Sequence, residues 1–246
     1  MAAVIVVGGS TGTGRVLAIR LAHAGQNVSI VSRKPGQTLG DAANRITHWH
    51  ADLSQSEDIE RITKHDTERW GSASALVLCQ RNRGQNSGWN EEFRVSLEAS
   101  RAFIEAFADS RNKGQGGSIV AMTSVASHYV AVEQPVEYNA AKAALAQMVR
   151  YYAAALAPHG IRVNAVAPAA VLKPETSRYY LKDERRMEMY RRAIPLGAIP
   201  TSEDVCGVIE FLLSDAAAMV TGQEIVVDGG LSLLTHEGLA RKMWKE

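Results

Sequence analysis

The chain has 246 residues, 46% hydrophobic and 22% charged, with a formal net charge of +1 at pH 7. This length allows one large domain with a full core, and the balanced charge gives no reason to expect a nucleic-acid partner. No apolar run approaches the ~20 residues that span a bilayer, and residues 1–7 lack the basic region of a signal peptide, so we expect a cytoplasmic protein without a membrane partner.

Short apolar runs alternate with amphipathic segments along the chain. Seven runs predict strands: Ala3–Val7, Asn27–Ser32, Ile46–Ala51, Ala75–Cys79, Ser118–Thr123, Ile161–Ala167 and Glu224–Val227. Four segments predict helices: Arg15–Ala24, Ser56–Trp70, Glu91–Ala108 and Val136–Leu156. Apolar strands that alternate with helices indicate a parallel sheet covered on both faces. We therefore predict a single-domain, doubly wound α/β fold over residues 1–246.

Residues 171–199 follow neither pattern. This stretch is dense in charge and neither strand-like nor cleanly helical, which predicts a lid or substrate loop. The two cysteines, Cys79 and Cys206, have neither metal-ligand spacing nor a disulfide framework. Two cysteines without a disulfide framework suit a reducing compartment, and the lack of metal-ligand spacing predicts no metal site.

A glycine-rich turn separates the first predicted strand from the first predicted helix. It reads Gly8-Gly9-Ser10-Thr11-Gly12-Thr13-Gly14. Glycine permits positive φ and close approach of the backbone to a ligand, and the helix that follows offers free N–H groups to a pyrophosphate. The setting favours nucleotide binding over a merely tight turn, although the spacing differs from the general Gly-x-Gly-x-x-Gly fingerprint.

The second predicted strand ends in Ser32-Arg33-Lys34 without an acidic residue. An NAD site usually has Asp or Glu here to accept from the ribose hydroxyls, whereas a 2′-phosphate needs basic groups. Arg33 has the planar fork that suits phosphate. This pattern favours NADP(H) over NAD(H), with Arg33 and Lys34 as cofactor contacts; the alternative is a solvated basic pair.

Tyr138 and Lys142 are four residues apart in an alanine-rich helical segment. Positions i and i+4 share a helix face, so the phenol and the ammonium can point into one pocket. A nearby ammonium favours the phenolate form of tyrosine. The pair therefore indicates a proton donor and the group that tunes it, although an ordinary helix surface can carry the same spacing.

With a serine upstream, these motifs resemble the short-chain dehydrogenase/reductase family over essentially the whole chain. The match is similar to its compact ketoreductase branch, as in 3-oxoacyl-carrier-protein reductases. Supporting stretches are Gly117-Ser118-Ile119-Val120, Gly160-Ile161-Arg162-Val163-Asn164-Ala165-Val166-Ala167-Pro168, Thr221-Gly222-Gln223 and Val227-Asp228-Gly229-Gly230. The resemblance implies a Rossmann-type fold and an oxidoreductase that interconverts a small carbonyl and an alcohol.

Site roles follow from the resemblance residue by residue. Tyr138 would be the general acid and base, Lys142 would bind the nicotinamide ribose, and Ser124 would hold the substrate carbonyl, unless it is a turn or cap residue. The expected cofactor contacts are Gly8, Ser10, Thr11, Gly12, Thr13, Gly14, Arg33, Lys34, Asp52, Leu53, Tyr138, Lys142, Pro168 and Val171. An Asp at a strand end is also an ordinary helix cap, so that alternative stays open for Asp52.

The resemblance also implies a homodimer or homotetramer built through the alanine-rich helix. Residues 231–246 form a C-terminal extension beyond the minimal family ending. This extension would cover a neighbouring subunit or the mouth of the site.

Several positions depart from the family pattern. The Asn-Asn-Ala-Gly motif after the fourth strand is Leu78-Cys79-Gln80-Arg81, so the sheet needs another brace there. Ser96 stands where the family has a catalytic asparagine that holds a relay water, which predicts slower proton resupply. Ser124 precedes Tyr138 by fourteen residues, one more than usual, which leaves Ser127 as the less favoured alternative.

Basic residues gather near the expected substrate position. Arg81 and Arg83 follow the fourth predicted strand at its carboxyl end, and Lys173 opens the lid. We hypothesise a substrate with a carboxylate or phosphate, or one presented on an acidic carrier. The alternative is that the lid is a solvated helix pair, with Asp183-Glu184-Arg185-Arg186 pairing locally.

Two functional interpretations are compatible with these motifs and departures. The leading interpretation is an NADPH-dependent ketone/alcohol oxidoreductase that uses Ser124, Tyr138, Lys142 and Ser96. The alternative is a dinucleotide-binding sensor or scaffold with little turnover. A sugar-nucleotide epimerase of the extended branch is disfavoured, because the chain is too short for the extra substrate domain.

Overall fold

The computed structural model describes residues 3–34, 40–65, 73–82, 88–111 and 115–244. Seven parallel strands form one sheet in the order β3-β2-β1-β4-β5-β6-β7. Their bounds are β1 Ala3–Val7, β2 Asn27–Ser32, β3 Ile46–His50, β4 Ala73–Leu78, β5 Gly117–Met122, β6 Ile161–Pro168 and β7 Glu224–Val227. The predicted doubly wound, seven-stranded sheet is confirmed, with strand bounds that differ by two residues at most.

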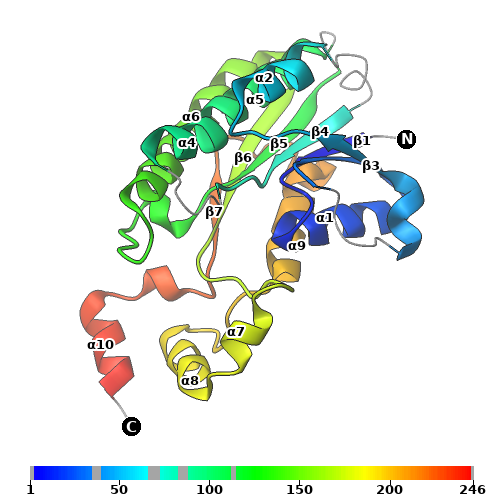
Figure 1. Cartoon of the computed structure of the whole chain (residues 1–246). Helices are drawn as coiled ribbons and strands as arrows, with labels where there is room; N and C mark the ends of the chain where they lie inside the picture. Colours follow the sequence, from blue (N-terminus) through cyan, green and yellow to red (C-terminus); the bar gives the residue numbers. More distant parts are fainter. Residues whose placement is uncertain (1–2, 35–39, 66–72, 83–87, 112–114, 245–246) are drawn as a thin grey trace.

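Helices cover both faces of this sheet (Figure 1). The α-helices that the structure describes are α1 Gly12–His23, α2 Ser56–Glu60, α4 Trp89–Phe93, α5 Ala99–Asp109, α6 Val136–Leu156, α7 Ser177–Leu181, α8 Glu184–Ala193, α9 Ser202–Leu213 and α10 His236–Trp244. π-helical turns at Arg61–His65 and Arg94–Glu98 extend α2 and connect α4 to α5. None of the described helices is long and apolar enough to cross a bilayer.

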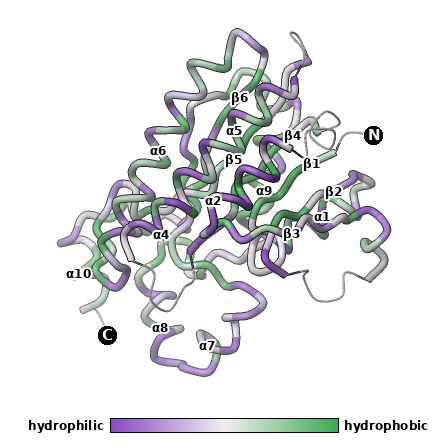
Figure 2. Tube along the Cα trace, turned by 45° about the horizontal axis from the view of Figure 1, so that its top comes forward, coloured by the Kyte–Doolittle hydropathy of each residue, from purple (hydrophilic) through white to green (hydrophobic). Residues whose placement is uncertain are grey.

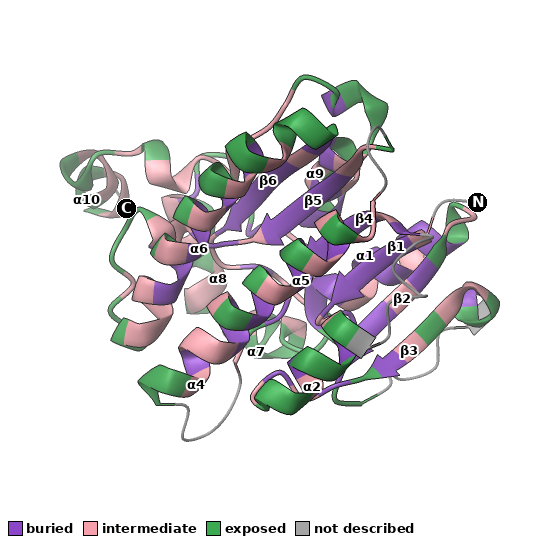
Figure 3. Cartoon of the chain, turned by 90° about the horizontal axis from the view of Figure 1, so that it is seen from above, coloured by how far each residue is buried: buried purple, intermediate pink, exposed green. Residues whose placement is uncertain are grey.

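The core has two layers, one on each side of the sheet. On one face, α1 and α9 pack their apolar residues on the strands, with Leu17, Ile209 and Leu212 almost fully buried. On the other face, α2, α5 and α6 do the same, with Phe103 and Phe107 fully buried. Figure 3 shows this arrangement as buried strands and inner helix faces under an exposed outer surface. Burial of apolar surface on both faces explains why the strand sequences are apolar throughout.

The lid differs from the rest of the fold. Residues 171–199, interpreted as a lid or substrate loop with a solvated helix pair as the alternative, contain α7 and α8 as a short helix pair. Within the described chain neither helix has a buried residue, and Figure 2 shows largely hydrophilic colouring along them. A helix with no buried apolar face gives a weak periodic signal, so sequence pattern alone supported this pair only as an alternative.

The C-terminal extension folds as α10 and lies beside α8. The Arg192 guanidinium donates to the carbonyl oxygen of Met243 at 3.0 Å. Trp244, the last residue of α10, is 88% exposed. The extension therefore packs against the lid within this chain and leaves the indole on the surface.

Candidate active site

The glycine-rich turn lies directly against the chain that follows β4. Gly8 has a φ of +79°, and a Cβ there would be 2.7 Å from the Cα of Gln80. A Cβ on Gly14 would be 2.6 Å from the carbonyl oxygen of Gly8. Both positions therefore require glycine, and the turn sits between β1 and β4, where the strand order reverses and open α/β sheets bind their ligands.

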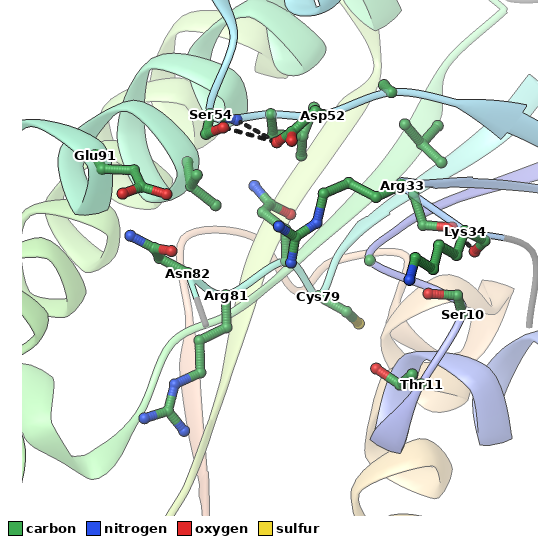
Figure 4. Close-up of a pocket in the computed structure, with 17 residues that line it drawn as sticks. Ser10, Thr11, Arg33, Lys34, Asp52, Ser54, Cys79, Arg81, Asn82 and Glu91 are labelled. Carbon is green, nitrogen blue, oxygen red and sulfur yellow. Dashed lines mark hydrogen bonds between the residues drawn. The ribbon is translucent and has the colours of Figure 1, made fainter. Parts of the chain in front are cut away.

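A cavity of about 440 Å³ opens beside this turn (Figure 4). Seven of the predicted cofactor contacts line it: Gly8, Ser10, Thr11, Arg33, Lys34, Asp52 and Leu53. In Figure 4, the guanidinium of Arg33 extends into the cavity and Lys34 lies on the side of Ser10. The wall thus combines the backbone of the turn and hydroxyl groups with three cations, Arg33, Lys34 and Arg81, and two carboxylates, Asp52 and Glu91. The cations suit an anionic ligand.

Asp52 has a structural role in addition to lining this cavity. Its Oδ1 accepts hydrogen bonds from the backbone N–H and the hydroxyl of Ser54, at 3.0 and 2.8 Å. The helix-cap alternative does not hold for α2, whose N-cap residue is Gln55. Asp52 instead fixes the turn that follows β3.

A second cavity of about 100 Å³ adjoins the first. Its walls include Ser124, Tyr138, Lys142, Pro168, Val171 and Lys173, together with Thr13 and Gly14 of the turn. Thr11, Cys79, Gln80 and Arg81 line both cavities. The tertiary structure thus brings together predicted site residues from the glycine turn, β5, α6 and β6. Arg83 lies outside the described residues.

Tyr138 and Lys142 project from the first turns of α6. The Lys142 Nζ lies 5.8 Å from the centroid of the Tyr138 ring and donates to the carbonyl oxygen of Met122 at 2.8 Å. Burial lowers the pKa of Lys142 from 10.5 to about 8, and the Glu92 carboxylate opposes that shift. The ammonium therefore titrates much closer to neutral pH than an ordinary lysine.

Ser124, and not Ser127, faces Tyr138 across the second cavity. The Ser124 hydroxyl accepts from the N–H of Ala126 at 3.2 Å and so caps the short 3-10 helix Val125–Ser127. Ser127 turns away and donates to a Glu224 carboxylate oxygen at 2.9 Å. Ser124 is thus both a cap residue and a member of the cavity wall.

Arg81 makes a contact that sequence reasoning did not predict. Its Cζ lies 4.8 Å from the centroid of the Tyr138 ring, and its guanidinium donates to the side-chain oxygen of Gln134 at 2.6 Å. The cation therefore stacks directly on the phenol. No local signal reveals such a contact, since 57 positions separate Arg81 from Tyr138 in the sequence.

Ser96 is buried and is absent from both cavity walls, although its neighbour Val95 lines the first cavity. It donates a hydrogen bond of 2.5 Å to the buried carboxylate of Glu92, and its carbonyl oxygen accepts from Ser100 at 2.7 Å. The Gln80 amide donates to the Ser100 hydroxyl at 2.7 Å. This buried chain of hydrogen bonds braces the end of β4 where the family asparagine motif is missing.

The lid supplies a carboxylate to the glycine-rich turn. The N–H of Gly12, at the N-terminus of α1, donates to a Glu175 carboxylate oxygen at 2.8 Å. The free N–H groups of a helix N-terminus favour anions. Glu175 thus takes a position that a phosphate group would also occupy, and no sequence pattern predicts this contact.

Comparisons with known proteins agree with this geometry. The family described as enoyl-(acyl carrier protein) reductase matches residues 8–232. An L-rhamnose 1-dehydrogenase (NAD(P)(+)) of Sphingomonas sp. (strain SKA58) is 32% identical, covering 93% of this chain and 95% of that protein. A cyclohexanol dehydrogenase of Rhodococcus sp. (strain TK6) is 31% identical, with 93% and 95% covered.

Solved structures of dehydrogenases have the same fold as this chain. An acetoin dehydrogenase from Salmonella typhimurium superimposes with a TM-score of 0.79 at 27% identity, covering 96% of this chain and 99% of that one. An NAD(P)-dependent dehydrogenase from Beutenbergia cavernae, with NADP bound at low occupancy, gives a TM-score of 0.80 at 28% identity, with 95% and 97% covered.

We expect Lys142 to make the stability of the chain depend on pH. Its pKa is about 8 in the folded chain and 10.5 as an ordinary lysine, so between these values the unfolded chain binds more protons and stability rises with pH. Relative to Lys142→Met, the wild type should gain roughly 2–3 kcal/mol between about pH 7.5 and pH 10. Urea unfolding of both proteins measures this gain, and parallel stability curves would contradict it.

Proposed function

The chain belongs to the short-chain dehydrogenase/reductase family and is an NAD(P)-dependent oxidoreductase; from that premise we propose that it interconverts a ketone and a secondary alcohol, with NADP(H) as cofactor. The observation that carries this proposal is the cavity where Ser124, Tyr138 and Lys142 meet. That cavity shares walls with the larger one beside the glycine turn.

The residues beside the turn fit a dinucleotide. The glycines leave room where a Cβ would collide, and Arg33 and Lys34 line a cavity of about 440 Å³. In this proposal, the turn residues hold the pyrophosphate and Arg33 recognises the 2′-phosphate. When bound, the nicotinamide supplies or accepts the hydride.

Tyr138 moves the proton in the proposed reaction. During ketone reduction its phenol donates a proton to the carbonyl oxygen, and during alcohol oxidation its phenolate takes the hydroxyl proton. The Ser124 hydroxyl holds the same oxygen by a hydrogen bond. Lys142 places a positive charge beside the phenol, so that charge developing on Tyr138 is stabilised in a buried pocket.

The substrate is proposed to be small and anionic. The two similar proteins described above are named for L-rhamnose, a sugar, and cyclohexanol, a cyclic alcohol, which are small and uncharged. In this chain, Arg81 and Lys173 add two cations to the walls of the second cavity. Cations at the mouth of a reaction site favour a substrate with a carboxylate or phosphate group, free or on a carrier.

We also propose an oligomeric state and a cellular location for the protein. The solvent-exposed face of α6 carries small and aromatic residues, with Ala143 and Ala154 exposed and Tyr151 66% exposed. Small residues allow close approach of a second helix, and we propose a cytoplasmic homodimer or homotetramer built through α6. A monomeric mass by light scattering would rule out that assembly.

Tyr138→Phe tests the reaction. Loss of the proton donor should lower kcat by a factor of about 10²–10⁴ while the Kd for NADPH stays unchanged, because the ring and its packing remain. The measurement follows NADPH absorbance with a panel of neutral and anionic ketones. Full activity in the variant would refute the role of Tyr138, and tight NADPH binding by an inactive wild type would support the sensor alternative.

Arg33→Ala tests the cofactor. Removing a charge-assisted hydrogen bond to phosphate should raise the Kd for NADPH on the order of tenfold and leave the Kd for NADH nearly unchanged. Fluorescence titration measures both constants. Glu175→Ala is the control of opposite sign, because removal of the lid carboxylate frees the Gly12 N–H and should tighten both dinucleotides. Equal weakening for NADPH and NADH in Arg33→Ala would refute 2′-phosphate recognition.

Arg81→Gln and Lys173→Gln test the substrate class. Each should raise KM for an anionic ketone by about tenfold, the effect of losing one hydrogen bond to a charged group, and leave KM for a neutral ketone unchanged. Steady-state kinetics with a matched pair of ketones measures this difference. An equal change for both ketones would exclude a role in anion recognition.

A further inference from the structure

A buried carboxylate lies behind the catalytic pocket. Glu92, in α4, is 4% exposed, and Ser96, one turn later, is 1% exposed. The Ser96 hydroxyl donates to the Glu92 Oε1 at 2.5 Å. Burying a carboxylate costs free energy unless hydrogen bonds or charges compensate, so the Glu92–Ser96 pair needs a physical reason to be retained at this position.

The segment that carries Glu92 and Ser96 packs against α6. Ser96 lies in the π-helical turn Arg94–Glu98 between α4 and α5, and single π turns inside helices occur frequently at functional sites. Both α4 and this turn pack against α6, which carries Tyr138 and Lys142. Figure 3 shows α4 beside the first turns of α6.

Lys142 is surrounded by charges of both signs. Arg81, after β4, and Lys173, after β6, are cations that disfavour its ammonium form. Glu92, from α4, favours the ammonium, and so does the Cys79 thiol when ionised. Burial raises the pKa of Cys79 to about 12, so this thiol is neutral at physiological pH. Glu92 therefore supplies the negative charge that offsets Arg81 and Lys173.

We propose that Glu92 is a positioning residue for the reaction: its carboxylate, fixed by Ser96, keeps Lys142 charged beside Tyr138. The Glu92–Ser96 pair then occupies the place where the family has a single asparagine. The catalytic consequence rests on the proposed function, because it assumes that Lys142 acts on Tyr138. The charge coupling itself does not depend on turnover and is measurable in the chain without cofactor.

A double-mutant cycle of unfolding tests the coupling. Glu92→Gln, Lys142→Met and the double variant are unfolded in urea at about pH 6.5 and about pH 9.5. At the lower pH, Glu92→Gln should change the unfolding constant roughly tenfold more with Lys142 present than with Met. At the higher pH, the difference should shrink because Lys142 is neutral. Glu98→Gln, on the same helical segment and 60% exposed, is the matched control and should show no coupling.

The pH profile of ketone reduction tests the catalytic role. Glu92→Gln should move the alkaline loss of activity down by about one pH unit, Glu92→Asp should restore part of that shift, and Glu98→Gln should leave the profile unchanged. A purely structural role for Glu92 predicts equal destabilisation with Lys142 or Met, and an unshifted profile.

The outcomes separate the two proposals. Absence of coupling at both pH values, together with an unshifted profile in an active enzyme, overturns the role of Glu92 and leaves the oxidoreductase intact. Coupling without turnover by the wild type on any ketone overturns the proposed function, while the electrostatic pairing of Glu92 and Lys142 stands.

Discussion

The close contact between the Gly8 turn and the chain after β4 is the constraint on which the site depends. Parallel pairing of β1 with β4 brings Gly8 so close to Gln80 that a side chain on Gly8 has no room. This contact sets the crevice at the reversal of strand order. One side of it presents Arg33 and Asp52, and the other leads to Ser124 and Tyr138. Residues distant in sequence thus share two adjoining cavities.

Charge balance controls the chemistry that this crevice can perform. Lys142 is buried beneath the site, and burial alone would favour its neutral form. The cations after β4 and β6 act in the same direction, whereas Glu92 acts against them. In the proposed function, Arg81 and Lys173 suit an anionic substrate, but both lower the pKa of Lys142. The buried Glu92 carboxylate raises that pKa and so offsets their effect. Arg81, Lys173 and the Glu92–Ser96 pair thus form one electrostatic arrangement around Lys142.

The lid contacts both the edge of the fold and the glycine-rich turn. Its first residues pair Leu172 with Thr201 at the start of α9, and α10 packs against α8 at the other end. Between these supports, Glu175 reaches the N-terminus of α1. A carboxylate and a phosphate compete for the same N–H group there. In the proposed binding mode, a dinucleotide that enters here displaces the Glu175 side chain from the Gly12 N–H.

The strands, the helix α6 and the glycine turn could be predicted from the amino-acid sequence, because each follows from a local rule. Apolar runs mark buried strands, and the i, i+4 spacing places Tyr138 and Lys142 on one face. The contacts of Arg81 with Tyr138, Glu175 with Gly12 and Glu92 with the environment of Lys142 emerge from the packing of the folded chain. These partners are far apart in the chain, and their meeting depends on how helices and loops pack on the sheet, which local periodicity does not encode. The helix pair of the lid was only an alternative at the level of sequence for a related physical reason, since its helices bury no apolar face.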